Sequence, residues 1–71
     1  MSHIRKIAAH RILFDGKVLK MFVVEVIDGK VSDFRQLQGE EAYTEWLGGD
    51  IELKKNDDGD LLAYHNGIRL T

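Results

Sequence analysis

The sequence of 71 residues contains no cysteine and no proline. Without cysteine the chain forms no disulfide, thiolate zinc site, iron–sulfur centre or cysteine nucleophile. Without proline, every strand keeps its full set of backbone donors. The chain also lacks an apolar run of the roughly 18–20 residues that span a bilayer. Its start, Met1–Lys6, has no signal-peptide-like apolar stretch. These absences predict a cytoplasmic domain.

A large excess of charge of one sign is also missing. The formal net charge is −2, while 44% of the residues are apolar. That balance argues against disorder, which requires few apolar residues and a high net charge. It also argues against a module held mainly by phosphate contacts. We therefore expect a single domain over residues 1–71 that binds neither nucleic acid nor membrane.

Turn dipeptides divide the first half of the chain. Asp15-Gly16 and Asp28-Gly29 are typical of the tight turns that join two antiparallel strands. The segments around them are rich in Ile, Val, Leu and Phe, and they run over His3–Phe14, Lys17–Ile27 and Lys30–Leu37. The pattern predicts a three-stranded antiparallel meander.

Charge pairs test the register of this meander. If both loops contain two residues, Lys6 faces Glu25, which is favourable. Arg11 then faces Lys20, which is unfavourable. This conflict predicts a β-bulge or a longer loop near the first turn.

The hydrophobic period changes between Gly39 and Gly49. Apolar residues recur there with the spacing of one helical stripe, at Ala42, Tyr43, Trp46 and Leu47. We expect a short helix that packs on the sheet with Trp46 as its largest anchor. On that expectation, Trp46→Ala costs about 3–5 kcal/mol of folding free energy.

Three further strands are expected after this helix. Residues Ile51–Lys54 alternate apolar and polar, and Asn66-Gly67 joins Leu61–Tyr64 to Ile68–Leu70 in a closing hairpin. The predicted fold class is therefore mainly β, α+β at most. Its form is an antiparallel meander or small sandwich with the order β-β-β-α-β-β-β and one short helix.

The residue pattern favours no catalytic or metal chemistry. His3, His10 and His65 lack partners at the spacings that place two ligands on one face of a strand or helix. The acidic run Asn56–Asp60 lacks the glycine and glutamate positions of a calcium loop. No nucleophile motif or phosphate-binding glycine loop is present. We expect a non-enzymatic protein with no catalytic residue, no cofactor and no metal.

A basic cluster lies in the first strands, with Arg5, Lys6, Arg11, Lys17 and Lys20 as its members. Aromatic residues that could stack on bases are not interleaved with it. We interpret the cluster as the solvated side of an edge strand, where charge also discourages aggregation.

Residues 6–34 resemble the small N-terminal β domain of amidohydrolase-superfamily enzymes. The likeness is carried by AHRILFDGK at Ala9–Lys17 and VVEVIDGKV at Val23–Val31. It implies a free-standing relative of that non-catalytic domain, with a small-sandwich fold. Where the family has a metal-binding His-x-His pair, Asp50–Lys55 follows Leu47-Gly48-Gly49 here, and we expect no catalytic barrel. No catalytic residue is carried over.

The expected function follows from the segment Leu19–Ile27, which is apolar on both of its strand faces. If one face stays uncovered, its row of side chains favours burial against a partner. We expect protein–protein contact, first of all a homodimer. The alternative is a small-ligand-binding or accessory β domain, in line with the resemblance. The candidate interface residues are Leu19, Met21, Phe22, Val24 and Val26.

Overall fold

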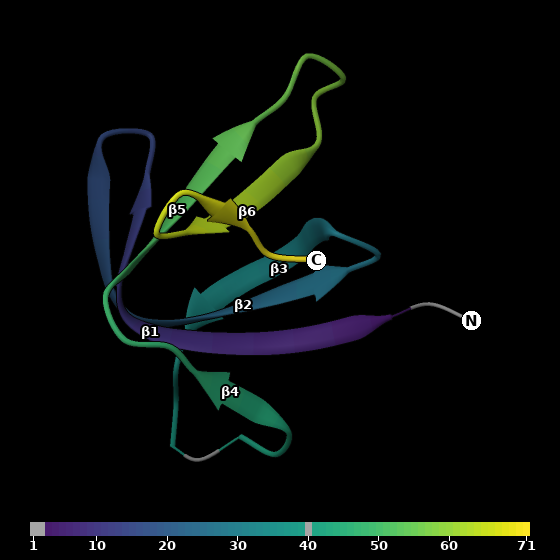
Figure 1. Cartoon of the computed structure of the whole chain (residues 1–71). Coiled ribbons are helices and arrows are strands. Elements are labelled where there is room, and N and C mark those ends of the chain that lie inside the picture. The colour runs from purple at the N-terminus through teal and green to yellow at the C-terminus, as the bar shows by residue number, and fades with distance from the viewer. Residues whose placement is uncertain (1–2, 40) are drawn as a thin grey trace.

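The computed structural model describes residues 3–39 and 41–71 (Figure 1). Its described residues form strands and connecting segments and no helix, so the mainly β prediction is confirmed. The strands are β1 (Ile4–Phe14), β2 (Lys17–Ile27), β3 (Lys30–Gln36), β4 (Thr44–Trp46), β5 (Asp50–Lys55), β6 (Leu61–His65) and β7 (Ile68–Arg69). Nothing in this described part is a helix of the length and hydropathy that would cross a membrane.

Strand β1 organises the single seven-stranded sheet. Its whole length pairs antiparallel with β2, and β2 pairs antiparallel with β3. The predicted meander is therefore confirmed. The other edge of β1 is shared by two strands that run parallel to it, β4 at Lys6–Ala8 and β5 at Arg11–Phe14. The sheet order is β3-β2-β1-β5-β6-β7 with β4 beside β1, so the sheet is mixed rather than wholly antiparallel.

The predicted helix is wrong. Residues Thr44–Trp46 form β4, and the Leu47 N–H donates to the Ala8 carbonyl at 3.1 Å. Tyr43 has a φ of 57°, which a right-handed helix does not allow. A helix of about two turns is marginal by itself. The ladder to β1 satisfies the same backbone groups, so pairing with an available strand edge is favoured over local helix formation.

A bend interrupts the alternation of β1. Ala9 and Ile12 are both fully buried in the core although they are three residues apart. His10 and Arg11 lie between them, and both are exposed. A regular strand reverses sides at every residue. Two consecutive outward residues therefore mean that the strand twists here, so that the inward-facing positions change from odd-numbered to even-numbered residues. We call this a turning over of the strand.

Strand β2 turns over at the same level. Leu19 and Phe22 pack against the core, and Lys20 and Met21 between them are exposed. Met21 has a φ of 56°, in the left-handed region that side chains other than glycine seldom occupy. Arg11 still pairs with Lys20, so the expected bulge or longer loop near the first turn is absent. The register shift lies instead between β2 and β3, at Glu25/Val26.

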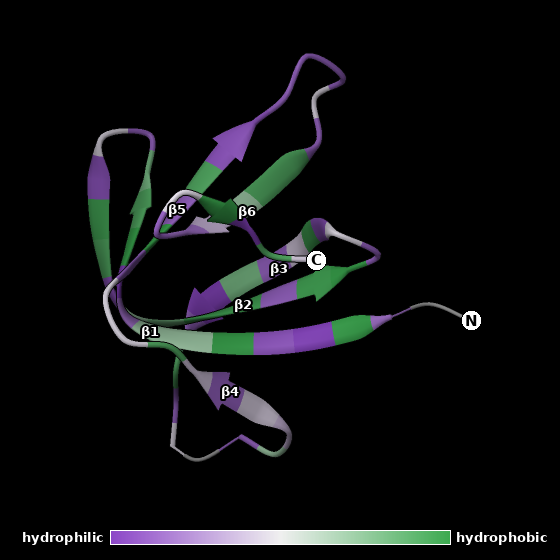
Figure 2. Ribbon diagram, viewed as in Figure 1, coloured by the Kyte–Doolittle hydropathy of each residue, from purple (hydrophilic) through white to green (hydrophobic). Residues whose placement is uncertain are grey.

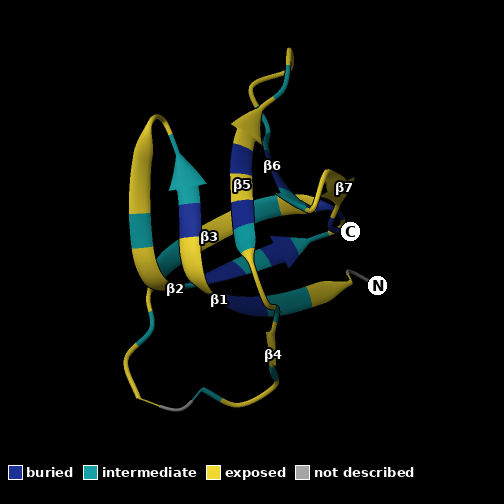
Figure 3. Cartoon of the chain, turned by 60° about the vertical axis from the view of Figure 1, so that its left-hand side comes forward, coloured by how far each residue is buried: buried dark blue, intermediate teal, exposed yellow. Residues whose placement is uncertain are grey.

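The bent sheet curls into a partly closed barrel around one core. Strand β3 lies against β6 (Figure 1). Arg69 Nη2 donates to the Gly29 carbonyl at 3.0 Å. Hydrophobic residues gather on the central strands, while the β5–β6 loop is hydrophilic (Figure 2). Burial is concentrated in the inner parts of β1, β2, β5 and β6 (Figure 3). The core residues are Ile7, Ala9, Ile12, Val24, Val26, Ile51, Leu53, Ala63 and Leu70.

The outer face of β1 and β2 is covered as well. Ala8 and Val23 pair with each other and are both fully buried. In the register they lie between Trp46 of β4 and Arg35 of β3. Arg35 in turn binds Glu41 at 2.6 Å, in the segment that crosses from β3 to β4. The doubly apolar β2 thus finds cover on both faces within one chain.

Two arginine–carboxylate pairs fasten the parallel strands to β1. Arg5 binds Glu45 at 2.8 and 2.9 Å, and Arg11 binds Asp50 at 2.6 and 2.9 Å. Hydrogen bonding from Arg5 lowers the pKa of Glu45 below its ordinary 4.5. Hydrogen bonding from Arg11 likewise lowers the pKa of Asp50 below 3.8. Each carboxylate is therefore held in its charged form.

We predict a loss of stability in acid from these pairs. A carboxyl whose folded pKa is lowered stabilises the fold above its unfolded pKa, and this stabilisation disappears as pH falls through the folded pKa. Chemical unfolding measured from pH 7 downward should therefore show stability falling below about pH 4.5. The double variant Glu45→Gln/Asp50→Asn should show a shallower fall. Equal slopes for the two proteins would contradict this account of the pairs.

Candidate functional site

The five residues predicted as an interface do not form one exposed surface. Val24 and Val26 are 0% and 1% exposed and belong to the core. Leu19 and Phe22 are partly buried against that core. Met21 is 39% exposed and lies on the outer side of the bend. The predicted row is corrected because β2 turns over between Leu19 and Phe22, and because the sheet curls over its own apolar face.

Exposed aromatic and sulfur side chains lie elsewhere, around β4. Trp46 is 52% exposed, and Tyr43 just before β4 is 96% exposed. The Trp46 ring lies 5.6 Å from the His10 ring, centroid to centroid, at an angle of 47°. Met21 lies opposite His10, bracketed by the pairs on either side of it. We call these four residues, His10, Met21, Tyr43 and Trp46, the Trp46 surface.

A hollow adjoins the Trp46 surface. Its volume is about 270 Å³, and its lining is Leu37, Gly39, Glu41, Thr44 and Trp46. The floor of the hollow is held in place by Glu41, whose carboxylate contacts Arg35 and Lys6 at 2.6 and 3.7 Å. The indole of Trp46 therefore stands at the edge of a depression with a rigid polar base. In known protein interfaces, anchoring side chains of one partner fill depressions of this kind on the other.

Among the described strands only β1 pairs with β4, so β4 has a second backbone edge without a strand partner beside the same surface. The Leu47 N–H faces β1, where it binds the Ala8 carbonyl. Backbone groups of successive strand residues alternate between the two edges. The N–H and C=O of Trp46 therefore point away from β1. Unpaired edge groups of this kind are a template for an added strand.

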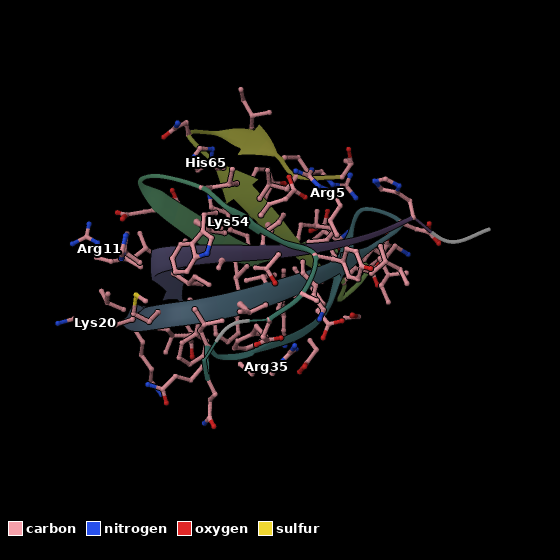
Figure 4. The ribbon with its side chains drawn as sticks, turned by 90° about the horizontal axis from the view of Figure 1, so that it is seen from below. Arg5, Arg11, Lys20, Arg35, Lys54 and His65 are labelled. Carbon is pink, nitrogen blue, oxygen red and sulfur yellow. The ribbon has the colours of Figure 1, made fainter. Side chains whose placement is uncertain are left out.

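Three of the five residues of the predicted basic cluster form ion pairs within the chain. Arg5, Lys6 and Arg11 bind Glu45, Glu41 and Asp50, respectively. Among the described residues, no carboxylate lies within 4.0 Å of the ammonium groups of Lys17 and Lys20, the other two members. Figure 4 shows Arg11 and Lys20 at one end of the molecule, both directed outward. The cluster serves mainly to hold β4 and β5 against β1.

His10 and His65 make separate contacts with different parts of the chain. The His10 ring packs on Trp46, and a ring nitrogen of His65 lies 2.5 Å from the Gly48 carbonyl. The acidic run forms a turn in which the Asn56 side chain accepts hydrogen bonds from the N–H groups of Asp58 and Asp60. Over residues 3–39 and 41–71 the structure contains no group of three or more histidine, aspartate or glutamate side chains suited to a metal ion.

A second hollow lies at the end of β1 and β5. Its volume is about 430 Å³, and its lining is Phe14, Asp15, Leu53, Lys54 and Lys55. It combines apolar carbon with ammonium groups and differs in chemistry from the Trp46 surface.

Comparisons with protein-family models, with curated proteins and with solved structures found no match. The likeness of residues 6–34 to the amidohydrolase β domain stays a prediction.

The exposure of Trp46 changes the effect expected of its removal. Because about half of the side chain is exposed, Trp46→Ala should cost less than about 2 kcal/mol, not the 3–5 kcal/mol of a buried anchor. Denaturant unfolding of the variant measures this cost. Ile12→Ala, at a fully buried position, is the matched control and should cost about 2–5 kcal/mol. Equal losses for the two variants would place the indole in the core.

Proposed function

We propose that this protein is a non-enzymatic β-rich interaction domain that acts through protein–protein contact at the Trp46 surface. A second copy of the chain is its first partner. The observation that carries the proposal is the exposed Trp46 beside the free backbone edge of β4. Tryptophan, tyrosine and methionine are enriched at protein interfaces, and tryptophan and tyrosine dominate their binding energy. A half-exposed indole next to an unpaired strand edge offers a partner both aromatic side-chain contact and backbone hydrogen bonds.

Backbone strain at the same surface supports the proposal. Met21 and Tyr43 are bulky residues with φ values of 56° and 57°. Side chains in this region cost of order 1–3 kcal/mol and are concentrated at functional sites. Tyr43 is almost fully exposed, so packing within the chain does not repay its cost. A partner that contacts these side chains would.

Self-pairing fits the geometry of β4. Two copies related by a twofold axis can place their β4 edges antiparallel, so that the outward backbone groups of Trp46 pair across the axis. Glu45 at the centre of β4 is already neutralised by Arg5 at 2.8 Å, so two bare carboxylates do not meet. The pairing would extend the sheet and cover both indoles.

Other parts of the proposal follow from the charge pattern. Because three of its five cations are already paired, the basic cluster offers little to a phosphate backbone, and we propose no nucleic-acid or membrane partner. The lack of cysteine suits a reducing compartment, and we propose a cytoplasmic location.

The alternative function, a ligand-binding or accessory domain, is favoured by a different feature, the hollow at Phe14 and Leu53.

Light scattering over a dilution series tests the self-pairing. We expect a mass near twice 8.1 kDa at high concentration, falling toward 8.1 kDa on dilution. Trp46 is the sole tryptophan, so its fluorescence reports on the same surface and should shift to longer wavelength as the dimer dissociates.

Two variants locate the contact. Trp46→Ala should remain a monomer at every concentration. Ile68→Ala removes an apolar side chain that is 71% exposed but lies on β7, and it should dimerise like the parent protein. A parent mass of 8.1 kDa throughout would overturn the self-pairing, and so would loss of the dimer in Ile68→Ala alone.

A further inference from the structure

The barrel is open where its two long hairpins diverge. The β1–β2 hairpin and the β5–β6 hairpin rise apart from the body of the sheet (Figure 1). The hollow of about 430 Å³ between Phe14 and Leu53 lies at this end. Mouths of β-barrels are frequent positions for small-molecule sites, and this volume falls within their usual range of roughly 300–1,000 Å³.

The floor of the hollow is apolar and fixed in position. The Phe14 ring packs edge-on against Phe34, with centroids 5.3 Å apart. Leu53 is 4% exposed. Leu61 on β6 is not in the lining itself but pairs with Lys55, which is, and it packs partly buried against the same core. Phe14 and Leu61 remain only partly covered because no further described strand closes this end. An apolar group that enters the hollow would complete their burial.

Two ammonium groups belong to the rim of this floor. Lys55 follows Leu53 by two residues and pairs with Leu61, so it lies on the inner face of β5. Lys17 pairs directly with Phe14. It lines an adjoining hollow of about 350 Å³ that shares Phe14, Asp15 and Leu53 with the first one. In the described ranges, neither lysine has a carboxylate within 4.0 Å of its ammonium.

The other charged groups at the hollow do not cancel these cations. Lys54 binds Glu52 at 3.5 Å and lies 5.5 Å from the centre of the Tyr64 ring, so its charge is engaged elsewhere. Asp15 lines the hollow from the tight turn and contributes one exposed negative charge. Glu52 lines the adjoining hollow together with Lys17. Across the two hollows the three lysines, Lys17, Lys54 and Lys55, outnumber the carboxylates of Asp15 and Glu52 by one, so the rim is positive.

We propose that this hollow binds an amphipathic carboxylate, an apolar chain that carries one anionic head group. The chain would lie on Phe14, Leu53 and Leu61, and the carboxylate would lie between Lys17 and Lys55. A neutral apolar molecule would leave both ammonium groups unused, and an inorganic anion would leave the aromatic floor bare. The site lies away from the Trp46 surface and does not depend on self-pairing.

Titration with decanoate below its micelle concentration tests this site, followed by amide and methyl chemical shifts in NMR. We expect saturable shifts centred on Phe14, Leu53 and Leu61. Lys17→Gln/Lys55→Gln should weaken decanoate binding by about tenfold, because each partly exposed ion pair contributes up to about fivefold. The neutral analogue decanol should bind the parent and this variant equally.

Lys20→Gln is the matched control, since Lys20 is an exposed lysine on the outer side of the same strand. It should leave decanoate binding unchanged. Three results would overturn the proposal: no saturable shift at the hollow, equal affinity in the parent and the Lys17/Lys55 double variant, or an equal loss in Lys20→Gln. Both variants change only exposed side chains, and their folding is checked from the same spectra.

Discussion

The shared backbone of β1 is the constraint on which the rest of the structure depends. It pairs with β2 along one edge and with β4 and β5 along the other. Strands β3 and β6 attach through β2 and β5 in turn. The side chains of β1 supply Ile7, Ala9 and Ile12 to the core. The bend at His10 and Arg11 keeps Ile12 on the same inner side of the sheet as Ile7 and Ala9.

The bend also determines the positions of the two candidate sites. Two consecutive residues point outward from each of β1 and β2. This places the His10 ring against the indole of Trp46, with Met21 opposite His10 on β2. Beyond the bend, the first hairpin continues away from β3 and leaves the barrel open near Phe14. One local change of direction thus positions both the Trp46 surface and the hollow at Phe14, on which the two proposals rest.

The sequence supports the first half of the fold well, because its signals there are local. Asp15-Gly16 and Asp28-Gly29 have positive φ angles in the structure, as tight hairpin turns require. The register with Lys6 opposite Glu25 follows from those turns. The conflict of Arg11 with Lys20 is relieved from outside the hairpin by Asp50, a contact 39 residues away that no local pattern reveals.

The second half depends on contacts that are remote in sequence. Trp46 and Leu47 satisfy a helical period, yet their backbone pairs with β1, some forty residues earlier. The glycines that flank this segment, Gly39 and Gly48, leave room for barely two helical turns, and that shortness was the available signal against a helix. The predicted interface row on β2 depends on side chains that alternate strictly between the two faces of the strand. That alternation fails at Met21, where the backbone is left-handed. A left-handed methionine has no signature in the sequence.

The direct test of this account is therefore the backbone at Met21, measured by comparing Met21→Gly with Met21→Ala in chemical denaturation. Both variants remove the same side-chain contacts. In a regular strand, glycine is less stable than alanine by roughly 0.5–1 kcal/mol. At a φ of 56° the order reverses, because alanine keeps a left-handed strain of about 1 kcal/mol or more that glycine does not have. We predict that Met21→Gly is the more stable variant. A more stable Met21→Ala would show that β2 runs straight through this point and would contradict the bend, and with it the placement of both candidate sites.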